Sequence, residues 1–198
     1  TLHLTAVDDK TGLTSAQQNA AVLDRTRAML AQRDRVCRAL MAELAGQGVE
    51  LCPFGGLSDK QQAFLEKYFT TNVLPLLSPQ IIGRKQPFPF LRNKAIYAVA
   101  ILRTKSGGER MGIVPCGEGV LRRLVPLPGD GQRFVLVEEL IAGFLSKIFS
   151  HYKVEGAVLI RLVRSADIHM DDASSEMSAM LAEEYRKSME KLIRRRKR

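Results

Sequence analysis

Three side chains near the carboxyl end of the chain alternate in a pattern that could bind a metal ion. Asp167, His169 and Asp171 occupy every second position, so a β-strand would place all three on one face. Carboxylate and imidazole groups are common metal ligands. The two aspartates equally suit the start of a helix, where acidic side chains favour the positive end of the dipole. Since no second group of ligands is visible in the sequence, we favour the capping interpretation and predict no metal site.

The cysteines and glycines do not form a catalytic set either. Cys37, Cys52 and Cys116 are odd in number and widely separated, which is typical of reduced, mostly buried thiols in a cytoplasmic protein. Cys116 follows a proline and has no activating partner nearby in the sequence. The glycine groups at 117–120 and 128–131 lack the lysine and Ser/Thr of a phosphate-binding loop, so they predict turns. We therefore expect no catalytic residue in this chain.

The positive charge is concentrated at one end of the chain. The formal net charge is +9, but residues 186–198 hold eight basic residues against the single acid Glu190. One interpretation is a solvated helix end whose cations complement the negative end of the helix dipole. The other is a strip that binds a polyanion, which could be nucleic acid, a phosphate chain or acidic lipids. No aromatic residue follows Tyr185, which argues against base stacking and hence against a specific nucleic acid.

If the second interpretation holds, the candidate polyanion-binding residues belong to the tail and to the strand expected before it. They are Arg161, Arg164, Arg194, Arg195, Arg196, Lys197 and Arg198.

The elements that carry these groups begin with a long helix. Thr14 and Gln17 form a capping-box start, and apolar residues recur at three- and four-residue spacings as far as Leu44. Gly46 and Gly48 end the pattern. We expect a surface helix over about 14–46, from a helical-bundle domain of which this chain holds only the end.

Strand-forming runs follow a second helix that starts near Ser58. The runs at 95–102 and 111–115 flank Gly107 and Gly108 and predict a hairpin. Further strands are expected at 120–127, 133–137 and 155–170, with helices at 138–149 and from about Asp172. This order predicts an α+β fold, with a mixed or mostly antiparallel sheet, flanking helices and a long basic helix at the end. No stretch is long enough to span a membrane.

Alternating prolines stiffen the stretch RKQPFPFLRN at 84–93. Pro87 and Pro89 fix their own φ and keep the preceding residues extended. Phe88 and Phe90 stand between and after them as bulky apolar groups. We interpret these four residues as structural anchors that hold a connector in the core or against a neighbouring domain, in preference to a ligand site.

Several of these segments together resemble the first family of polyphosphate kinases. In the head (middle) domain of that family, a helix ending in a Tyr-Phe pair leads through Val-Leu-Pro to Pro-Phe-Pro-Phe and an Asn before an apolar strand. The matching residues here are Tyr68, Phe69, Val73, Leu74, Pro75, Pro79, Pro87 to Phe90 and Asn93. RFVLVEELIAGFLSKIF (133–149) and RLVRSADIHMDD (161–172) resemble later family segments in the same order. The chain departs from the family at Gly83 to Gln86, where relatives usually carry Asp-Pro-(Ala)-His.

The resemblance implies that residues 1–56 are the end of an amino-terminal helical domain and that 57–198 are the head domain. The parent enzyme would transfer the terminal phosphoryl of ATP reversibly onto polyphosphate through a phosphohistidine, using Mg²⁺. Its catalytic histidines lie in carboxy-terminal domains with no counterpart here, so the fragment would need no cofactor and would be inactive alone. Its implied role is a non-catalytic scaffold that contributes to dimer contacts and to the wall of the polyphosphate tunnel.

The implied partners are the rest of the parent chain, a second copy in a homodimer or larger assembly, and polyphosphate. The parent would be cytoplasmic or membrane-associated. The alternative from a different class is a stand-alone module that binds polyphosphate or RNA through the basic tail.

Overall fold

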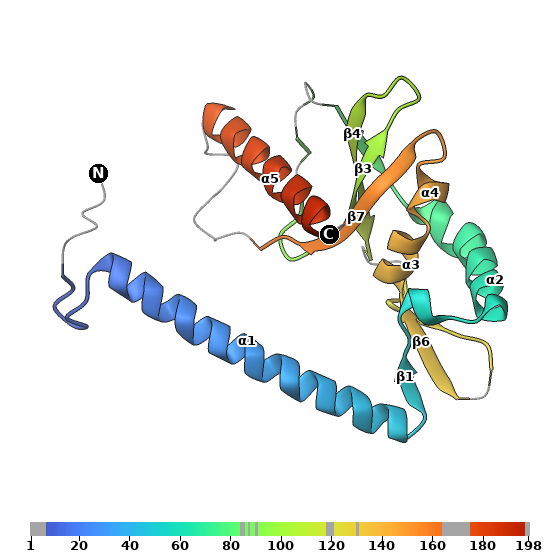
Figure 1. Cartoon of the computed structure of the whole chain (residues 1–198), viewed down its shortest axis with the longest axis horizontal. Coiled ribbons are helices and arrows are strands. Elements are labelled where there is room, and N and C mark those ends of the chain that lie inside the picture. Colours follow the sequence, from blue (N-terminus) through green and yellow to red (C-terminus); the bar gives the residue numbers. More distant parts are fainter. Residues whose placement is uncertain are drawn as a thin grey trace. The chain divides into compact units, whose positions relative to one another are not determined.

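The structure is a computed structural model that describes residues 7–83, 86, 88–89, 91–117, 121–129, 131–163 and 175–196. The chain divides into two compact units, Thr1–Glu50 and Leu51–Arg198. Unit 1 is dominated by α1 (Ser15–Gly46), drawn in blue in Figure 1. The predicted capping box is present, with the Thr14 N–H donating to Gln17 Oε1 at 2.8 Å and the Gln17 N–H to Thr14 Oγ1 at 3.3 Å. No described residue of α1 is buried.

Unit 2 is an α+β domain, as the sequence predicts. Its elements, in chain order after the boundary strand β1 (Val49–Leu51), are a 3-10 turn (Phe54–Gly56), α2 (Asp59–Tyr68), a π turn (Phe69–Val73), a 3-10 turn (Leu74–Leu76), β2 (Gln80–Ile82), β3 (Ile96–Arg103), β4 (Glu109–Cys116), β5 (Leu124–Pro126), β6 (Gln132–Leu136), α3 (Val137–Gly143), α4 (Leu145–Ile148), β7 (Lys153–Arg161) and α5 (Ser175–Arg196).

The main sheet has four strands in the order β2-β4-β3-β7, and all of its pairings are antiparallel. β3 and β4 form the hairpin predicted from Gly107 and Gly108, with Ala100 opposite Gly112. β7 lies on the other side of β3 and pairs Val158 with Val99. A smaller sheet contains β5 and β6, which also pair antiparallel. The sheet is thus antiparallel, the second of the two arrangements that the sequence left open.

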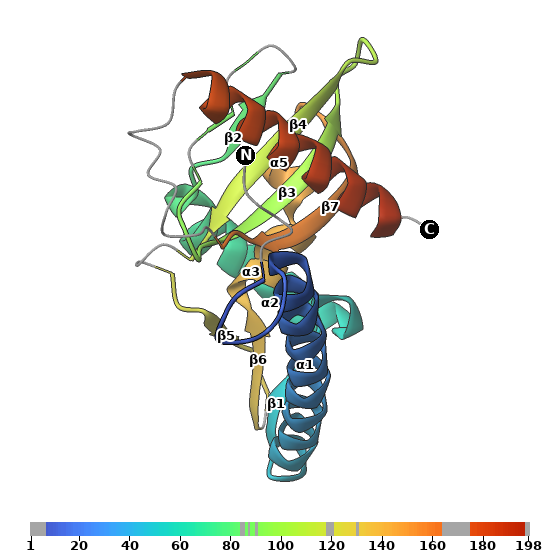
Figure 2. The same cartoon turned by 90° about the vertical axis from the view of Figure 1, so that its left-hand side faces the viewer.

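β3 separates two hydrophobic clusters, because its alternating side chains point to opposite faces of the sheet. Ala98, Ala100 and Leu102 belong to the first cluster, which α2, α3 and α4 cover. Tyr97, Val99 and Ile101 belong to the second cluster, which includes Met189 and Ile193 of α5. Figures 1 and 2 show α5 lying across one face of the sheet and α3 on the other.

Three predicted elements differ from the structure. The expected helix at 138–149 is broken at Phe144, whose φ of −104° and ψ of 21° leave the helical region. The Phe144 ring packs with Phe54 and Phe69 at centroid distances of 5.2 and 4.8 Å, so tertiary packing overrides the local helical pattern. Of the described residues in the run 120–127, only Leu124–Pro126 form a strand. The described part of the strand expected at 155–170 ends at Arg161.

Candidate functional site

The rotation of α5 about its axis is fixed by the apolar side chains of its inner face. Tyr185, Met189 and Ile193 are four residues apart, so they form one stripe, and all three pack in the second hydrophobic cluster. Met189 and Ile193 are almost completely buried. Side chains on the opposite side of the helix must therefore face solvent.

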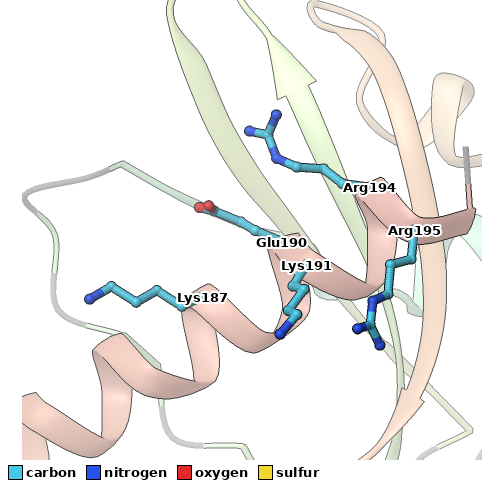
Figure 3. Close-up of a pocket in the computed structure, with 5 residues that line it drawn as sticks. All are labelled: Lys187, Glu190, Lys191, Arg194 and Arg195. Carbon is cyan, nitrogen blue, oxygen red and sulfur yellow. The ribbon is translucent and has the colours of Figure 1, made fainter.

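Three cations follow the same four-residue spacing on the solvent side. Lys187, Lys191 and Arg195 are exposed, and none of them forms an ion pair with another described residue. With Glu190 and Arg194 they line a surface pocket of ≈ 410 Å³. Figure 3 shows Lys191 and Arg195 extending to one side of the helix and Glu190 and Arg194 to the other. We call Lys187, Lys191 and Arg195 the basic row.

Two other cations of the same helix are engaged within the fold. Arg186 is buried, and its guanidinium donates to the carbonyl oxygens of Gly83 at 3.1 Å and Gln86 at 3.0 Å. The Arg194 guanidinium lies 3.4 Å from both carboxylate oxygens of Glu109 on β4. The dense charge of the tail therefore contains structural as well as solvent-facing cations.

The structure separates the predicted polyanion-binding residues. Arg194 and Arg195 line the α5 pocket. Arg161 ends β7, where its Nε donates to the Lys94 carbonyl oxygen at 3.0 Å and its side chain lines a different cavity. Only the backbone of Arg196 is described, and Arg164, Lys197 and Arg198 lie outside the described residues.

Lys187 and Lys191 were not predicted as members of this surface. Their distance of four residues from each other and from Arg195 is visible in the sequence. The sequence does not show which face of this helix packs against the core, and therefore which cations face solvent.

The proline-stiffened connector is described only in part. Phe88 is half-buried and packs against the second hydrophobic cluster, and Pro89 is also half-buried. Pro87 and Phe90 lie outside the described residues.

The structure does not test the candidate metal ligands, and it buries the Cys116 thiol. Asp167, His169 and Asp171 lie outside the described residues. The residues that are described contain no group of three or more His, Cys, Asp or Glu side chains that could hold a metal ion. Burial raises the pKa of the Cys116 thiol to about 12, so it stays protonated at neutral pH. The chemistry that the described site offers is therefore electrostatic attraction of anions.

Comparison with known proteins gives consistent matches. Residues 60–198 match the family model of the polyphosphate kinase middle domain. The polyphosphate kinase of Halalkalibacterium halodurans is 31% identical over 195 residues, which are 96% of this chain and 26% of that protein. The polyphosphate kinase of Bacillus cereus is 30% identical over 189 residues, covering 91% of this chain and 27% of that protein. The chain spans about a quarter of the length of these relatives.

A solved structure shares the fold. The crystal structure of polyphosphate kinase from Porphyromonas gingivalis aligns with a TM-score of 0.58 and 21% sequence identity. The alignment covers 78% of this chain and 26% of that one. In the part of the chain that the structure describes, no helix is long and apolar enough to cross a membrane.

Proposed function

The chain belongs to the polyphosphate kinase family, in which residues 60–198 are the middle domain, and we propose that it is a non-catalytic scaffold whose basic row contacts polyphosphate. The whole protein would be a cytoplasmic or membrane-associated enzyme that transfers the terminal phosphoryl of ATP reversibly onto polyphosphate. The phosphohistidine of that reaction would lie in other domains. This chain would help position those domains and form part of the surface that the polymer passes.

The basic row is the observation that supports polymer contact. Successive members of the row are four residues apart, which corresponds to about 6 Å along a helix. A linear polyanion with a regular charge repeat can contact all three cations at once. Because the cations are exposed, each contact should be weak and should release counterions, as in sequence-independent nucleic-acid binding.

A charge-matched pair of variants tests this contact. The first replaces Lys187, Lys191 and Arg195 by Gln. The second replaces Arg25, Arg35 and Arg38 of α1 by Gln, which removes the same charge from other exposed positions. We expect the basic-row variant of the 198-residue chain to bind long-chain polyphosphate about tenfold or more weakly, with a shallower dependence of log K on log salt. Equal losses in both variants, or an unchanged salt slope, would reject the basic row.

Comparing polyphosphate with RNA in the same assay separates the two classes of function. A middle domain that contacts its polymer should prefer polyphosphate over single-stranded RNA at equal total phosphate. Equal affinity for both would instead favour a general polyanion-binding module.

The proposed lack of catalysis has its own measurement. The phosphohistidine that the resemblance implies would lie in other domains, so we assign no step of phosphoryl transfer to this chain. With radiolabelled ATP and Mg²⁺ the chain should incorporate no phosphate and make no polymer. Labelling in proportion to protein concentration would contradict this.

The family resemblance also leads us to propose a homodimer or larger assembly for the whole enzyme. Sedimentation of the whole enzyme over a range of concentrations would reveal it, and a monomer throughout would reject it.

A further inference from the structure

A second cationic cavity lies where three strands of the main sheet end together. Ile96, the first residue of β3, is opposite both Cys116 at the end of β4 and Arg161 at the end of β7. This register brings Lys94 and Arg161 to one side of a cavity of ≈ 280 Å³, and Arg123, which directly precedes β5, also lines it. Ile96 and Val137 form part of its apolar lining. The cavity lies against the first hydrophobic cluster, whereas the basic row is on the helix that covers the second.

The main chain fixes two of these cations beside each other. Lys94 is the only non-glycine residue with a positive φ, 64°, among the residues that the structure describes. Its N–H donates to the Leu162 carbonyl oxygen at 2.7 Å, and its own carbonyl oxygen accepts from Arg161 Nε at 3.0 Å. These two hydrogen bonds hold the backbone of Lys94 beside the end of β7, where Arg161 lies. The remaining guanidinium nitrogens of Arg161 form no hydrogen bond with another described residue.

The charge of the third cation, Arg123, is offset by a carboxylate in the wall of the same cavity. Arg123 donates through Nε and Nη2 to the same carboxylate oxygen of Glu138, at 2.9 and 2.7 Å. Glu138 is only 5% exposed, so this carboxylate is held in the wall by its arginine. Lys94 and Arg161 therefore remain as two cations whose charges no described carboxylate in the lining offsets.

The size and lining of the cavity limit what can bind. Ligand sites for drug-sized molecules usually measure about 300–1,000 Å³, so ≈ 280 Å³ suits a compact ligand better than a nucleotide. Lys94 and Arg161 are exposed, so solvent and salt screen the attraction of each for an anion, and binding depends on both cations acting together. The Cys116 thiol in this wall is protonated because burial raises its pKa to about 12, so it does not repel an anion. The fork of Arg161 suits the paired oxygens of a phosphate or carboxylate group.

We propose that the cavity between Lys94, Arg123 and Arg161 binds a compact phosphorylated anion of the size of pyrophosphate. Lys94 and Arg161 would neutralise two negative charges, and Arg123 would contribute its remaining N–H donors while staying paired with Glu138. The choice of a phosphorylated ligand over a dicarboxylate rests on the proposed function, whereas the presence of an anion site rests on the cavity alone.

Calorimetric titration of the 198-residue chain with pyrophosphate tests the proposal. Arg161→Gln removes one of the two charges that no described carboxylate in the lining offsets. Lys94→Asn removes the other and keeps a residue type that tolerates a left-handed backbone. Each variant should bind pyrophosphate about tenfold more weakly, because each loses a charge-assisted hydrogen bond. Arg161→Lys should lose less affinity than Arg161→Gln, since it keeps the charge.

Lys153→Gln is the matched control, because Lys153 is an exposed lysine at the other end of β7. Its affinity for pyrophosphate should equal that of the wild type. Equal weakening in Lys153→Gln, or no weakening in Arg161→Gln and Lys94→Asn with unchanged thermal unfolding, would overturn the proposed site. Malonate binding as tightly as pyrophosphate would overturn the phosphorylated ligand class.

The proposed polymer contact of the basic row and the proposed anion site in the cavity can be rejected separately. The basic-row variant should keep its affinity for pyrophosphate while losing affinity for long-chain polyphosphate, and the cavity variants should keep their salt slope for the polymer. If the basic-row variant alone lost pyrophosphate binding, the compact anion would belong to α5 and the cavity assignment would be wrong.

Discussion

The guanidinium of Arg186 on α5 donates a hydrogen bond to the carbonyl oxygen of Gly83, at 3.1 Å, across a separation of 103 positions in the chain. A second bond reaches the Gln86 carbonyl oxygen at 3.0 Å, and the Gly83 N–H donates to Gln86 Oε1 at 2.7 Å. Arg186 is only 9% exposed. This cation therefore joins the last helix to the segment that follows β2.

Replacing Arg186 by Met should lower the free energy of unfolding of unit 2 by roughly 2–3 kcal/mol, because two charge-assisted hydrogen bonds are lost. Urea unfolding followed by tyrosine fluorescence measures this selectively, since all four tyrosines lie after residue 51 and the chain has no tryptophan. Lys187→Met, at the exposed neighbouring position, should change stability by no more than about 0.5 kcal/mol. Similar losses in both variants would mean that the contact with Gly83 adds little.

Gly112 should not tolerate even a methyl group. A Cβ atom at this position would lie 2.7 Å from the Phe149 ring and 2.9 Å from a methyl of Leu102, and both side chains are buried. Gly112→Ala should therefore cost about 1–3 kcal/mol through overpacking. Gly55→Ala, where no atom lies within 4 Å of the added Cβ, is the control and should stay within about 0.5 kcal/mol of the wild type.

A double variant shows whether the Phe149 ring is the cause. Adding Phe149→Leu to Gly112→Ala should cost less than the sum of the two single changes, because the smaller side chain relieves the clash. Strict additivity in chemical denaturation would place the strain elsewhere.

Arg123 should stabilise the fold by holding the buried carboxylate of Glu138. Arg123→Met leaves that carboxylate without its guanidinium partner and should cost about 1–2 kcal/mol. We expect a smaller cost than for breaking a fully buried pair, because the side chain of Arg123 is 64% exposed although that of Glu138 is only 7% exposed. Converting Glu138 to Leu in the same chain should restore part of the loss. A double variant less stable than Arg123→Met alone would contradict this account.

Stability should fall at alkaline pH because of Cys116. Desolvation raises the pKa of its thiol from 9.0 to about 12, so above pH 9 the unfolded state holds fewer protons than the folded state. The contribution of the protonated thiol is complete below about pH 9 and is lost between there and about pH 12. The stability difference between wild type and Cys116→Ala should therefore shrink as pH rises over this range, as measured by circular dichroism in urea. Cys37→Ala, at an exposed position of α1, should show no such trend.

The sequence predicted correctly those elements that depend on interactions between residues close together in the chain. The capping box at Thr14 and the hairpin around Gly107 are confirmed, because a side chain three residues away or a turn glycine determines each. The break at Phe144 could not be predicted, since it depends on rings from Phe54 and Phe69 that meet it only in the folded domain.

The sequence predicted that the candidate site would be rich in cations, but it did not predict which cations face solvent. The tail supplies adjacent cations in sequence, and the fold assigns them different roles: Arg186 is buried, Arg194 faces Glu109 and Lys191 faces solvent. Lys94 and Arg123 were missed as members of the cavity around Arg161 because they are 29 positions apart in the sequence. Strand register brings such residues together, and no local spacing signals it.

β3 lies inside the main sheet and separates the two cationic surfaces from each other. Because the compact cavity and the cationic helix lie against opposite faces of one continuous sheet, a small anion cannot bridge them. A polymer that touched both would have to curve around an edge of the sheet. A small ligand on one face therefore has no direct contact with a ligand on the other.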